Sequence, residues 1–348
     1  MNRFLLDILV CPACKVGLTV EPPGFDLGEE IISGALRCEN CSNSFPIVNR
    51  IPRFVPPENY ATSFGFQWNT FKTEQLDSEN GSTISEDRFY SVTEWQKGWM
   101  EGKLILDAGC GAGRFLDISS RAAGQVVGVD LSNAVDASLS SLTDRTNVHL
   151  VQASLYDLPF RSGTFDGTYC IGVVQHTPDP ERSLECLAET VKPAGHLGLF
   201  IYERRRWTML YSKYLLRPIT KRLSQKNLLF LIKVLMPIFF PLTEVLFRIP
   251  RLGRVFMFMI PVSNYVGENT GSAPKLSIKQ RYQWAIMDTF DMLAPAYDSP
   301  MTLNEVNETL TRCSFAEIKR TGGIGLCIDA TKSDHVDGPD GTDRIATV

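Results

Sequence analysis

Four of the nine cysteines form two Cys-x-x-Cys pairs near the amino terminus, Cys11 with Cys14 and Cys38 with Cys41. Each pair can supply two thiolates from one tight turn, and the loop between the pairs allows the turns to face each other. This spacing is typical of a closed tetrahedral zinc site, which leaves no coordination position for a substrate. The alternative is four unligated thiols. The pairs predict a structural zinc whose binding contributes folding free energy, because so short a segment buries little apolar surface.

A second group of candidate residues follows an apolar run, in the order Leu106-Asp107-Ala108-Gly109-Cys110-Gly111-Ala112-Gly113. Glycines at a strand-to-helix turn allow a ligand to approach the backbone closely. The dinucleotide fingerprint requires a third glycine where this chain has Arg114, so that pattern fails. An acid two residues before the first glycine suits a cationic ligand better than a pyrophosphate. S-adenosylmethionine has an ammonium and a sulfonium group and no phosphate, so it fits this loop.

Asp130 is a third candidate, 23 residues after Asp107 and at the end of the next apolar run. A carboxylate in this place can accept hydrogen bonds from both ribose hydroxyls of a nucleoside. Asp130 would alternatively cap the following helix, but Ser132 and Asn133 are better placed for that. The position therefore favours a ribose-binding acid.

These candidates are positioned by alternating strand and helix patterns. The alternation predicts a parallel sheet with right-handed crossovers, in a doubly wound α/β fold. The predicted strands are 103–107, 125–130, 148–152, 165–171, 195–202, 315–321 and 324–330. The predicted helices are 114–123, 132–142, 180–191 and 303–313.

The 348 residues carry a formal net charge of −4, which argues against a general nucleic-acid binder. No amino-terminal signal peptide is evident, and the cysteine pairs are typical of a metal site in a reducing compartment. Together these two features predict a cytoplasmic protein. We divide the chain into a zinc ribbon (1–56), an irregular aromatic-rich lead-in or lid (57–102), a cofactor-binding core (103–203), a basic helical insert or cap (204–300), a carboxy-terminal helix and hairpin that complete the sheet (301–330), and a disordered tail (331–348).

Over residues 103–203 the motifs resemble class I S-adenosylmethionine-dependent methyltransferases of the type 11 kind. The resemblance implies a Rossmann-like sheet and a cofactor site. In that site Asp107, Ala108, Gly109 and Gly111 match the methionine-binding motif, Asp130 and Leu131 the ribose-binding motif, Ser154 and Leu155 the adenine-binding motif, and Ile171 the strand-four motif. Ser154 stands where the family usually has an acid. Residues 1–56 resemble the small zinc-ribbon domain that occurs alone as a methyltransferase activator and also fused to methyltransferases.

The residues that would meet a methyl acceptor are less specific. His176 follows the fourth strand, where ligands lie in open α/β sheets, and is a candidate general base or else a packed histidine. Asp288, Asp291 and Tyr297 lie in an aromatic and acidic cluster and are weak candidates for contacts with the acceptor. Gln67, Trp68 and Arg88 would form a lid or only a strap.

The stretch 204–260 contains twelve basic residues and one acid, interleaved with long aliphatic runs. Leu228–Phe247 is interrupted by Lys233, Pro237, Pro241 and Glu244, so we expect no transmembrane helix. Three interpretations remain: a cap over the site, an amphipathic surface for anionic lipid, or contact with RNA.

The sequence thus predicts a zinc-ribbon-fused methyltransferase that acts on a small or lipid-linked acceptor such as a sugar, polyketide or prenylated metabolite. It is expected in the cytoplasm, with peripheral contact at the inner membrane face. Two alternatives are a methyltransferase for bases of ribosomal or transfer RNA and a non-catalytic scaffold that binds S-adenosylmethionine. Neither the acceptor nor the oligomeric state follows from the residues.

Overall fold

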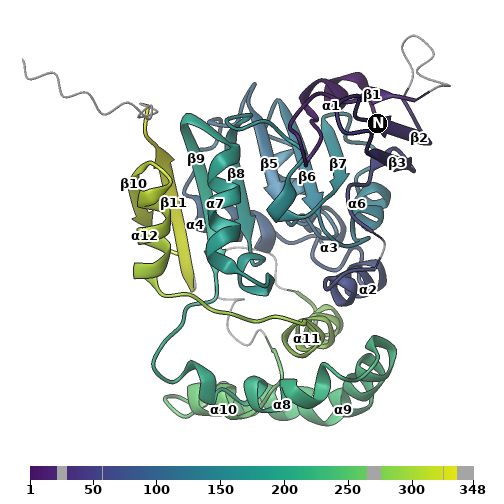
Figure 1. The fold of residues 1–348 in the computed structure, drawn as a ribbon. Helices are drawn as coiled ribbons and strands as arrows, with labels where there is room; N and C mark the ends of the chain where they lie inside the picture. Colours follow the sequence, from purple (N-terminus) through teal and green to yellow (C-terminus); the bar gives the residue numbers. More distant parts are fainter. Residues whose placement is uncertain (22–29, 57, 265–275, 324, 335–348) are drawn as a thin grey trace, which may run out of the picture.

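A computed structural model describes residues 1–21, 30–56, 58–264, 276–323 and 325–334. Figure 1 shows a central sheet with the amino-terminal segment at one edge and a layer of helices beyond the carboxyl ends of its parallel strands. The amino-terminal segment has helix α1 (Arg3–Ile8) and a four-stranded antiparallel sheet, with strands β1 (Thr19–Val20), β2 (Gly34–Arg37), β3 (Ser44–Val48) and β4 (Ile51–Pro52).

The central sheet has seven strands in the order β10-β11-β9-β8-β5-β6-β7. Its parallel strands are β5 (Leu104–Ala108), β6 (Gln125–Asp130), β7 (Val148–Gln152), β8 (Phe165–Ile171) and β9 (Val191–Ile201). An antiparallel hairpin completes one edge, with strands β10 (Phe315–Arg320) and β11 (Leu326–Lys332). The strand order reverses direction beside β5, and this switch point is where ligands bind in open α/β sheets.

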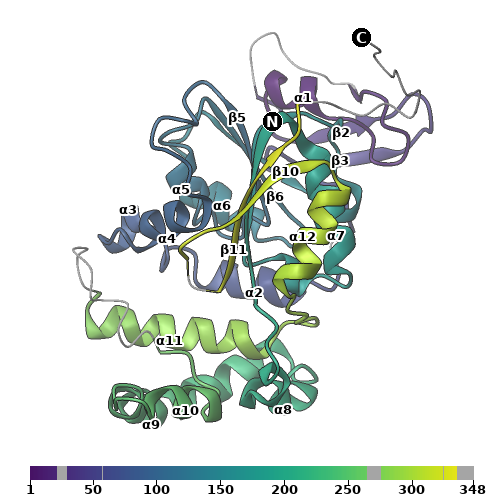
Figure 2. The ribbon, with the colours of Figure 1, turned by 90° about the vertical axis from the view of Figure 1, so that its left-hand side faces the viewer.

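Helices cover both faces of the sheet, as Figure 2 shows. One face carries α7 (Pro180–Thr190) and α12 (Leu303–Arg312), whose Leu184, Leu187 and Val306 are fully buried. The other face carries α4 (Ile84–Thr93), α5 (Leu116–Ser119) and α6 (Val135–Ser141). Two hydrophobic clusters, one on each face, thus hold the strands that end at the site.

The lead-in is helical, whereas the sequence predicted an irregular segment. Its helices are α2 (Thr62–Thr70), α3 (Asp77–Asn80) and α4. The aromatic side chains explain the difference, because tertiary packing stabilises helices that have weak local signals. Phe89 and Trp95 are buried against Tyr169 of β8, with ring centroids 5.1 and 6.1 Å from the tyrosine ring.

The insert contains α8 (Ser212–Thr220), α9 (Gln225–Leu246), α10 (Gly253–Met259) and α11 (Ile278–Leu293). Figures 1 and 2 show α11 between the sheet domain and an outer layer made of α8, α9 and α10. By length and composition α9 is able to cross a membrane, although the prolines and charges within it predicted otherwise. One of its faces is nevertheless packed against α11, through Ile232, Met236 and Phe240.

The amino-terminal segment is attached to the edge of the sheet beside β7. Val10 N donates to the carbonyl of Pro159 at 2.9 Å, and Lys15 Nζ donates to that of Leu158 at 2.9 Å. On the other side of the contact, Arg53 forms an ion pair with Asp136 at 2.7 Å. Leu5, Leu9 and the buried cysteines join the same hydrophobic cluster as the sheet, so the two parts share one core.

Most predicted strands and helices agree with the structure to within a few residues. The predicted cap of α6 is wrong: the helix begins after Ala134, without a side-chain cap. Asp130 accepts hydrogen bonds from both the amide and the hydroxyl of Ser132, at 2.8 and 2.7 Å, which commits that serine to the site. The predicted disordered tail begins too early, because β11 continues to Lys332, and residues 335–348 lie outside the described part.

Candidate active site and zinc site

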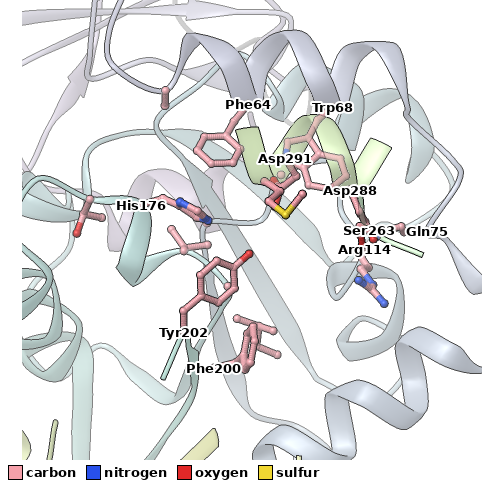
Figure 3. A pocket seen from close by; sticks show the side chains of 18 of the residues that line it. Phe64, Trp68, Gln75, Arg114, His176, Phe200, Tyr202, Ser263, Asp288 and Asp291 are labelled. Carbon is pink, nitrogen blue, oxygen red and sulfur yellow. The ribbon is translucent and has the colours of Figure 1, made fainter. Parts of the chain in front are cut away.

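One large cavity, with a volume of about 860 Å³, lies at the carboxyl ends of β5, β6 and β8. The glycine loop after β5 and Asp130 form one wall, and α2 and α11 supply others. Figure 3 shows Phe64 and Trp68 of α2 on one side of the cavity, with Asp288 and Asp291 of α11 nearby. Its volume lies in the upper part of the range of ~300–1,000 Å³ that is typical of ligand pockets. The cavity therefore has room for a cofactor and part of a second molecule.

Gly109 is required by both conformation and space. Its φ is +92°, and a Cβ atom there would lie 2.3 Å from a methyl carbon of Val173. The amides of Gly109 and Cys110 both donate to the carbonyl of Val129, at 2.7 and 3.0 Å. These bonds join the loop to the end of β6. The loop is thus held in place before any ligand binds.

Asp130 lines the cavity and is held by two further groups. Its Oδ2 accepts from the amide of Gly111 at 3.0 Å, and its Oδ1 accepts from Ser132. Burial raises the pKa of Asp130 above its ordinary value, while hydrogen bonds from Ser132 and Gly111 act in the opposite direction. Oδ1 already accepts two hydrogen bonds from Ser132, whereas Oδ2 accepts one and has capacity for another. Oδ2 is therefore the atom of Asp130 that can accept a hydrogen bond from a ligand hydroxyl in the cavity.

Asp107 and Ala108 lie behind the glycine loop and are buried. Burial raises the pKa of Asp107 well above its ordinary value, and the nearby hydroxyl of Tyr169 opposes this increase. Asp107 Oδ2 makes no hydrogen bond with the described residues. A buried carboxylate oxygen without a partner is costly, but neither Asp107 nor Ala108 is among the residues that line the cavity.

The remaining predicted cofactor residues divide into two groups. Leu131, Leu155 and Ile171 line the cavity. Ser154 is not among its lining residues. Its hydroxyl accepts from the amide of Tyr156 at 3.2 Å and so caps a short 3₁₀ helix, η1 (Leu155–Asp157). Ser154 therefore shapes the adenine side of the site from behind.

His176 lies in η2 (Val174–His176), at the end of β8, and lines the cavity while 5% exposed. Its Nδ1 is 3.0 Å from the carbonyl oxygen of Tyr297, so Nδ1 carries the hydrogen. Its Nε2 makes no hydrogen bond within the described part of the chain. Burial lowers the pKa of His176 to about 4. The ring is therefore neutral at neutral pH, with a free lone pair on Nε2.

The three weak acceptor candidates are arranged differently from one another. Asp288 and Asp291 line the cavity, whereas the side chain of Tyr297 does not and is 39% exposed. Burial, together with the charge of Asp288, raises the pKa of Asp291 to about 7. Tyr297 acts instead through its backbone carbonyl, which orients His176.

The proposed lid residues also differ from one another. Trp68 and Arg88 line the cavity, whereas Gln67 is buried, does not line it and interacts with Asp291. The indole Nε1 of Trp68 would be 3.1 Å from a Cβ atom at Gly111, so the lead-in packs directly on the glycine loop. The lead-in therefore covers the cofactor end of the cavity.

Sequence reasoning missed a buried polar group beside His176. Asp298, whose side chain is 1% exposed, accepts hydrogen bonds from Lys213 Nζ at 2.7 Å and from the hydroxyl of Tyr214 at 3.1 Å. The Lys213 ammonium lies 4.5 Å from the ring centre of Tyr202, and burial lowers the pKa of this lysine. Figure 3 shows Tyr202 and His176 directed toward the same part of the cavity. Asp298 belongs to the acidic cluster and Lys213 to the basic insert that the sequence indicated, but no local signal predicted that the two would pair.

The four cysteine sulfurs of the amino-terminal segment form one compact group, all within 4.8 Å of one another. Cys11 and Cys41 are 3.5 Å apart, and Cys14 and Cys38 are 3.3 Å apart, measured between sulfurs. A zinc ion with Zn–S bonds of ~2.3 Å in a tetrahedron requires sulfur separations of about 3.8 Å. The donor set and spacing therefore fit one four-coordinate zinc.

Two family matches cover separate parts of the chain. Residues 106–199 match the methyltransferase domain family, and residues 2–49 match the family of Trm112p-like proteins. The matches confirm the predicted fold class, the zinc-ribbon fusion and S-adenosylmethionine as the cofactor of this fold.

Individual relatives are similar over shorter stretches. A ubiquinone biosynthesis O-methyltransferase from Alkalilimnicola ehrlichii is 31% identical over 131 residues, which are 36% of this chain and 53% of the relative. Another, from Hydrogenovibrio crunogenus, is 34% identical over 121 residues, or 34% and 48% of the two chains. A solved S-adenosylmethionine-dependent methyltransferase from Methanosarcina mazei is 18% identical with a TM-score of 0.38, covering 68% of this chain and 95% of the other.

The chain spans about half the length of these two curated relatives. The span that matches the methyltransferase domain family includes the glycine loop and Asp130. The chain thus joins a methyltransferase domain at residues 106–199 to a Trm112p-like domain at residues 2–49.

Proposed function

We propose that the protein transfers a methyl group from S-adenosylmethionine to a hydroxyl oxygen of a small acceptor that has an apolar portion. One observation carries the proposal: a single cavity connects the cofactor end, at Gly109 and Asp130, with a polar end at His176 and Asp291. A methyl donor and its acceptor must lie in one space, because the transfer is an in-line displacement that depends on alignment.

Bound S-adenosylmethionine supplies an activated methyl group to the acceptor oxygen, and its sulfur takes the electron pair of the broken carbon–sulfur bond. The hydroxyl must then lose its proton, and His176 Nε2 is a neutral acceptor for it at the cavity surface. The Tyr297 carbonyl stabilises the imidazolium, since its bond to Nδ1–H strengthens when the ring becomes charged. Asp291 is the second group that can receive this proton.

The walls of the polar end indicate the character of the acceptor. Phe64, Phe200 and Tyr202 offer apolar and aromatic surface, while Asp288 and Asp291 offer hydrogen-bond acceptors. These walls suit a hydroxylated ring or a polyketide with an aliphatic portion. The curated relatives named for ubiquinone biosynthesis support a prenylated acceptor in particular.

The test uses the full chain, S-adenosylmethionine labelled in its methyl group, and fractionated cell extract. We expect label in lipid or small-molecule fractions and the release of S-adenosylhomocysteine. Label in RNA would identify a base methyltransferase instead. Cofactor binding by calorimetry without label in any fraction would contradict the proposal and favour a non-catalytic scaffold.

A further inference from the structure

We propose that the outer face of the layer formed by α8, α9 and α10 docks on membranes that contain anionic lipids. This proposal is independent of the chemistry above, because it concerns a surface and not the reaction. The observation behind it is that α9 is apolar on two opposite faces, only one of which is covered by the protein.

The covered face of α9 is an ordinary part of a hydrophobic core. Leu228, Ile232, Met236 and Phe240 are buried against α11, in a cluster that includes Trp284 and Phe290. Near the end of the helix, Asn264 donates to the hydroxyl of Thr243 at 2.9 Å. The apolar contacts thus hold α9 against α11, and Asn264, in the segment after α10, holds its carboxy-terminal part.

The uncovered face is equally apolar. At steps of three to four residues it carries Phe230, Val234, Ile238, Leu242 and Val245, all of them exposed. Phe230 is 70% exposed, and Ile238 and Val245 are each 66% exposed. Neighbouring segments of the layer add Leu215, Ile219, Leu252, Val255 and Met259. Soluble monomers rarely expose so many contiguous apolar side chains, and such patches mark contacts with membranes or partners.

The charge of the layer identifies the partner. Six exposed basic residues form no ion pair within the described part of the chain: Lys221, Arg222, Lys226, Lys233, Arg251 and Arg254. The single acid between residues 204 and 260 is Glu244, which already pairs with Arg248 and Arg281. Anionic headgroups attract such cations, and the aliphatic side chains then insert at the headgroup boundary.

Other partners fit this surface less well. A second copy of the chain would bring two like-charged faces together, which is unfavourable. Single-stranded nucleic acid prefers exposed aromatic side chains interleaved with the cations, whereas here the interleaved residues are mainly aliphatic. An anionic bilayer satisfies both the charge and the apolar face.

Not every basic residue of the insert contributes to the docking surface. Lys213 and Arg217, which the sequence placed with the basic surface, are buried and face Asp298 at 2.7 and 3.9 Å. Arg204 and Arg205 pair with Glu305 and Glu203. The docking surface therefore depends on the lysine and arginine side chains of α9, of α10 and of the segment before α9.

The surface is also connected with the cavity. Trp207, Tyr211 and Phe258 belong to the outer layer or to the turns that lead into it, and all three line the cavity. Trp207 is 69% exposed, and Tyr211 meets Phe258 edge to face at 5.4 Å. Tryptophan and tyrosine are favoured at the membrane–water interface. An acceptor with a lipid tail would thus enter the cavity from the side that faces the bilayer.

The test is co-sedimentation of the full chain with two kinds of vesicle, pure phosphatidylcholine and an equimolar mixture with phosphatidylglycerol. We expect binding to the mixed vesicles at low salt, release by high salt, and no binding to the neutral vesicles. The triple variant Lys221→Gln, Arg222→Gln, Lys226→Gln should bind the mixed vesicles roughly 100-fold more weakly, because it removes three cations that each contribute ~1 kcal/mol near an anionic surface.

A matched control removes three exposed cations from other faces, with Arg3→Gln, Arg37→Gln and Arg161→Gln, and should bind as the wild type does. A second variant, Phe230→Gln with Ile238→Gln, tests insertion at unchanged charge and should also reduce binding. Circular dichroism and thermal melting confirm that each variant is folded. Absence of wild-type protein from the mixed vesicles at low salt would overturn the proposal. So would a dimer that the Phe230 and Ile238 variant dissociates, or binding of transfer RNA in place of vesicles.

Discussion

The imidazole Nδ1 of His176 lies 3.0 Å from the backbone carbonyl oxygen of Tyr297, which is 121 residues later in the chain. A carbonyl only accepts, so Nδ1 must donate and Nε2 must hold the lone pair. The segment that follows α11 within the insert thus sets the tautomer of a histidine at the end of a core strand. The insert consequently takes part in the chemistry of the site as well as covering it.

His176→Asn should lower kcat by roughly 100-fold, since a positioned base typically contributes 10²–10⁴-fold. Affinity for S-adenosylmethionine should be unchanged, because His176 follows β8, two strands away from Asp130 at the end of β6. Steady-state kinetics and calorimetry separate the two effects. His196→Asn, at a half-buried histidine of β9 that does not line the cavity, is the control and should retain activity. Full activity in His176→Asn would exclude the histidine as the proton acceptor.

Asp130→Ala should weaken S-adenosylmethionine binding by roughly 10- to 100-fold, because hydrogen bonds to a charged group contribute ~1.5–3 kcal/mol. Isothermal calorimetry measures the change directly. Ser154→Ala should alter affinity only slightly, since this hydroxyl caps η1 and does not line the cavity. Equal affinities in wild type and a folded Asp130→Ala variant would mean that another group holds the ribose.

Asp291 should destabilise the folded protein increasingly as pH rises. Its pKa is raised from 3.8 to about 7, so between these values the folded state binds a proton that the unfolded state has released. The free energy of unfolding therefore falls with rising pH across this interval, by at most about 1.4 kcal/mol per pH unit. Asp291→Asn removes this dependence. In urea unfolding, the free energy of unfolding of Asp291→Asn relative to that of the wild type should increase from pH 5.5 to 7.5.

The pKa shift of His176 changes the free energy of unfolding with pH in the opposite direction, so this residue serves as the comparison. Burial lowers its pKa from 6.5 to about 4, so the unfolded state binds the extra proton between those values and stability rises with pH. The free energy of unfolding of His176→Asn relative to that of the wild type should therefore decrease between pH 5.5 and 6.5. An Asp291→Asn variant whose advantage is constant with pH would show that Asp291 has an ordinary pKa.

The amino-terminal site should hold one zinc per chain in protein purified without added metal. Elemental analysis checks the content. Cys38→Ser should reduce zinc content and thermal stability, because the metal orders a segment with little core of its own. Cys186→Ser, on α7 and away from the cluster, should leave both unchanged. Native protein without zinc, in which all four cysteines react with an alkylating agent, would contradict the site.

Local features of the sequence were sufficient to predict the strands of the central sheet and the positions of the main candidate residues. The strands β6, β7 and β8 have the predicted bounds. Each is a short apolar run between turn residues, and such a run can be recognised from the local sequence alone. The glycine loop, Asp130 and the cysteine pairs were likewise found from spacing alone. Each of these signals spans a few residues, or a repeat of a known motif, and needs no information from the rest of the chain.

The acceptor end was decided by the tertiary structure alone. The contacts of His176 with Tyr297 and of Lys213 with Asp298 join residues 121 and 85 positions apart, and no local pattern indicates such pairs. The same holds for the basic residues of the insert: Lys213 turns inward and Lys221 outward, although their side chains are identical. Which charge is buried depends on where a partner of opposite sign lies after folding, and that follows from the packing of α8 and α11 around Asp298.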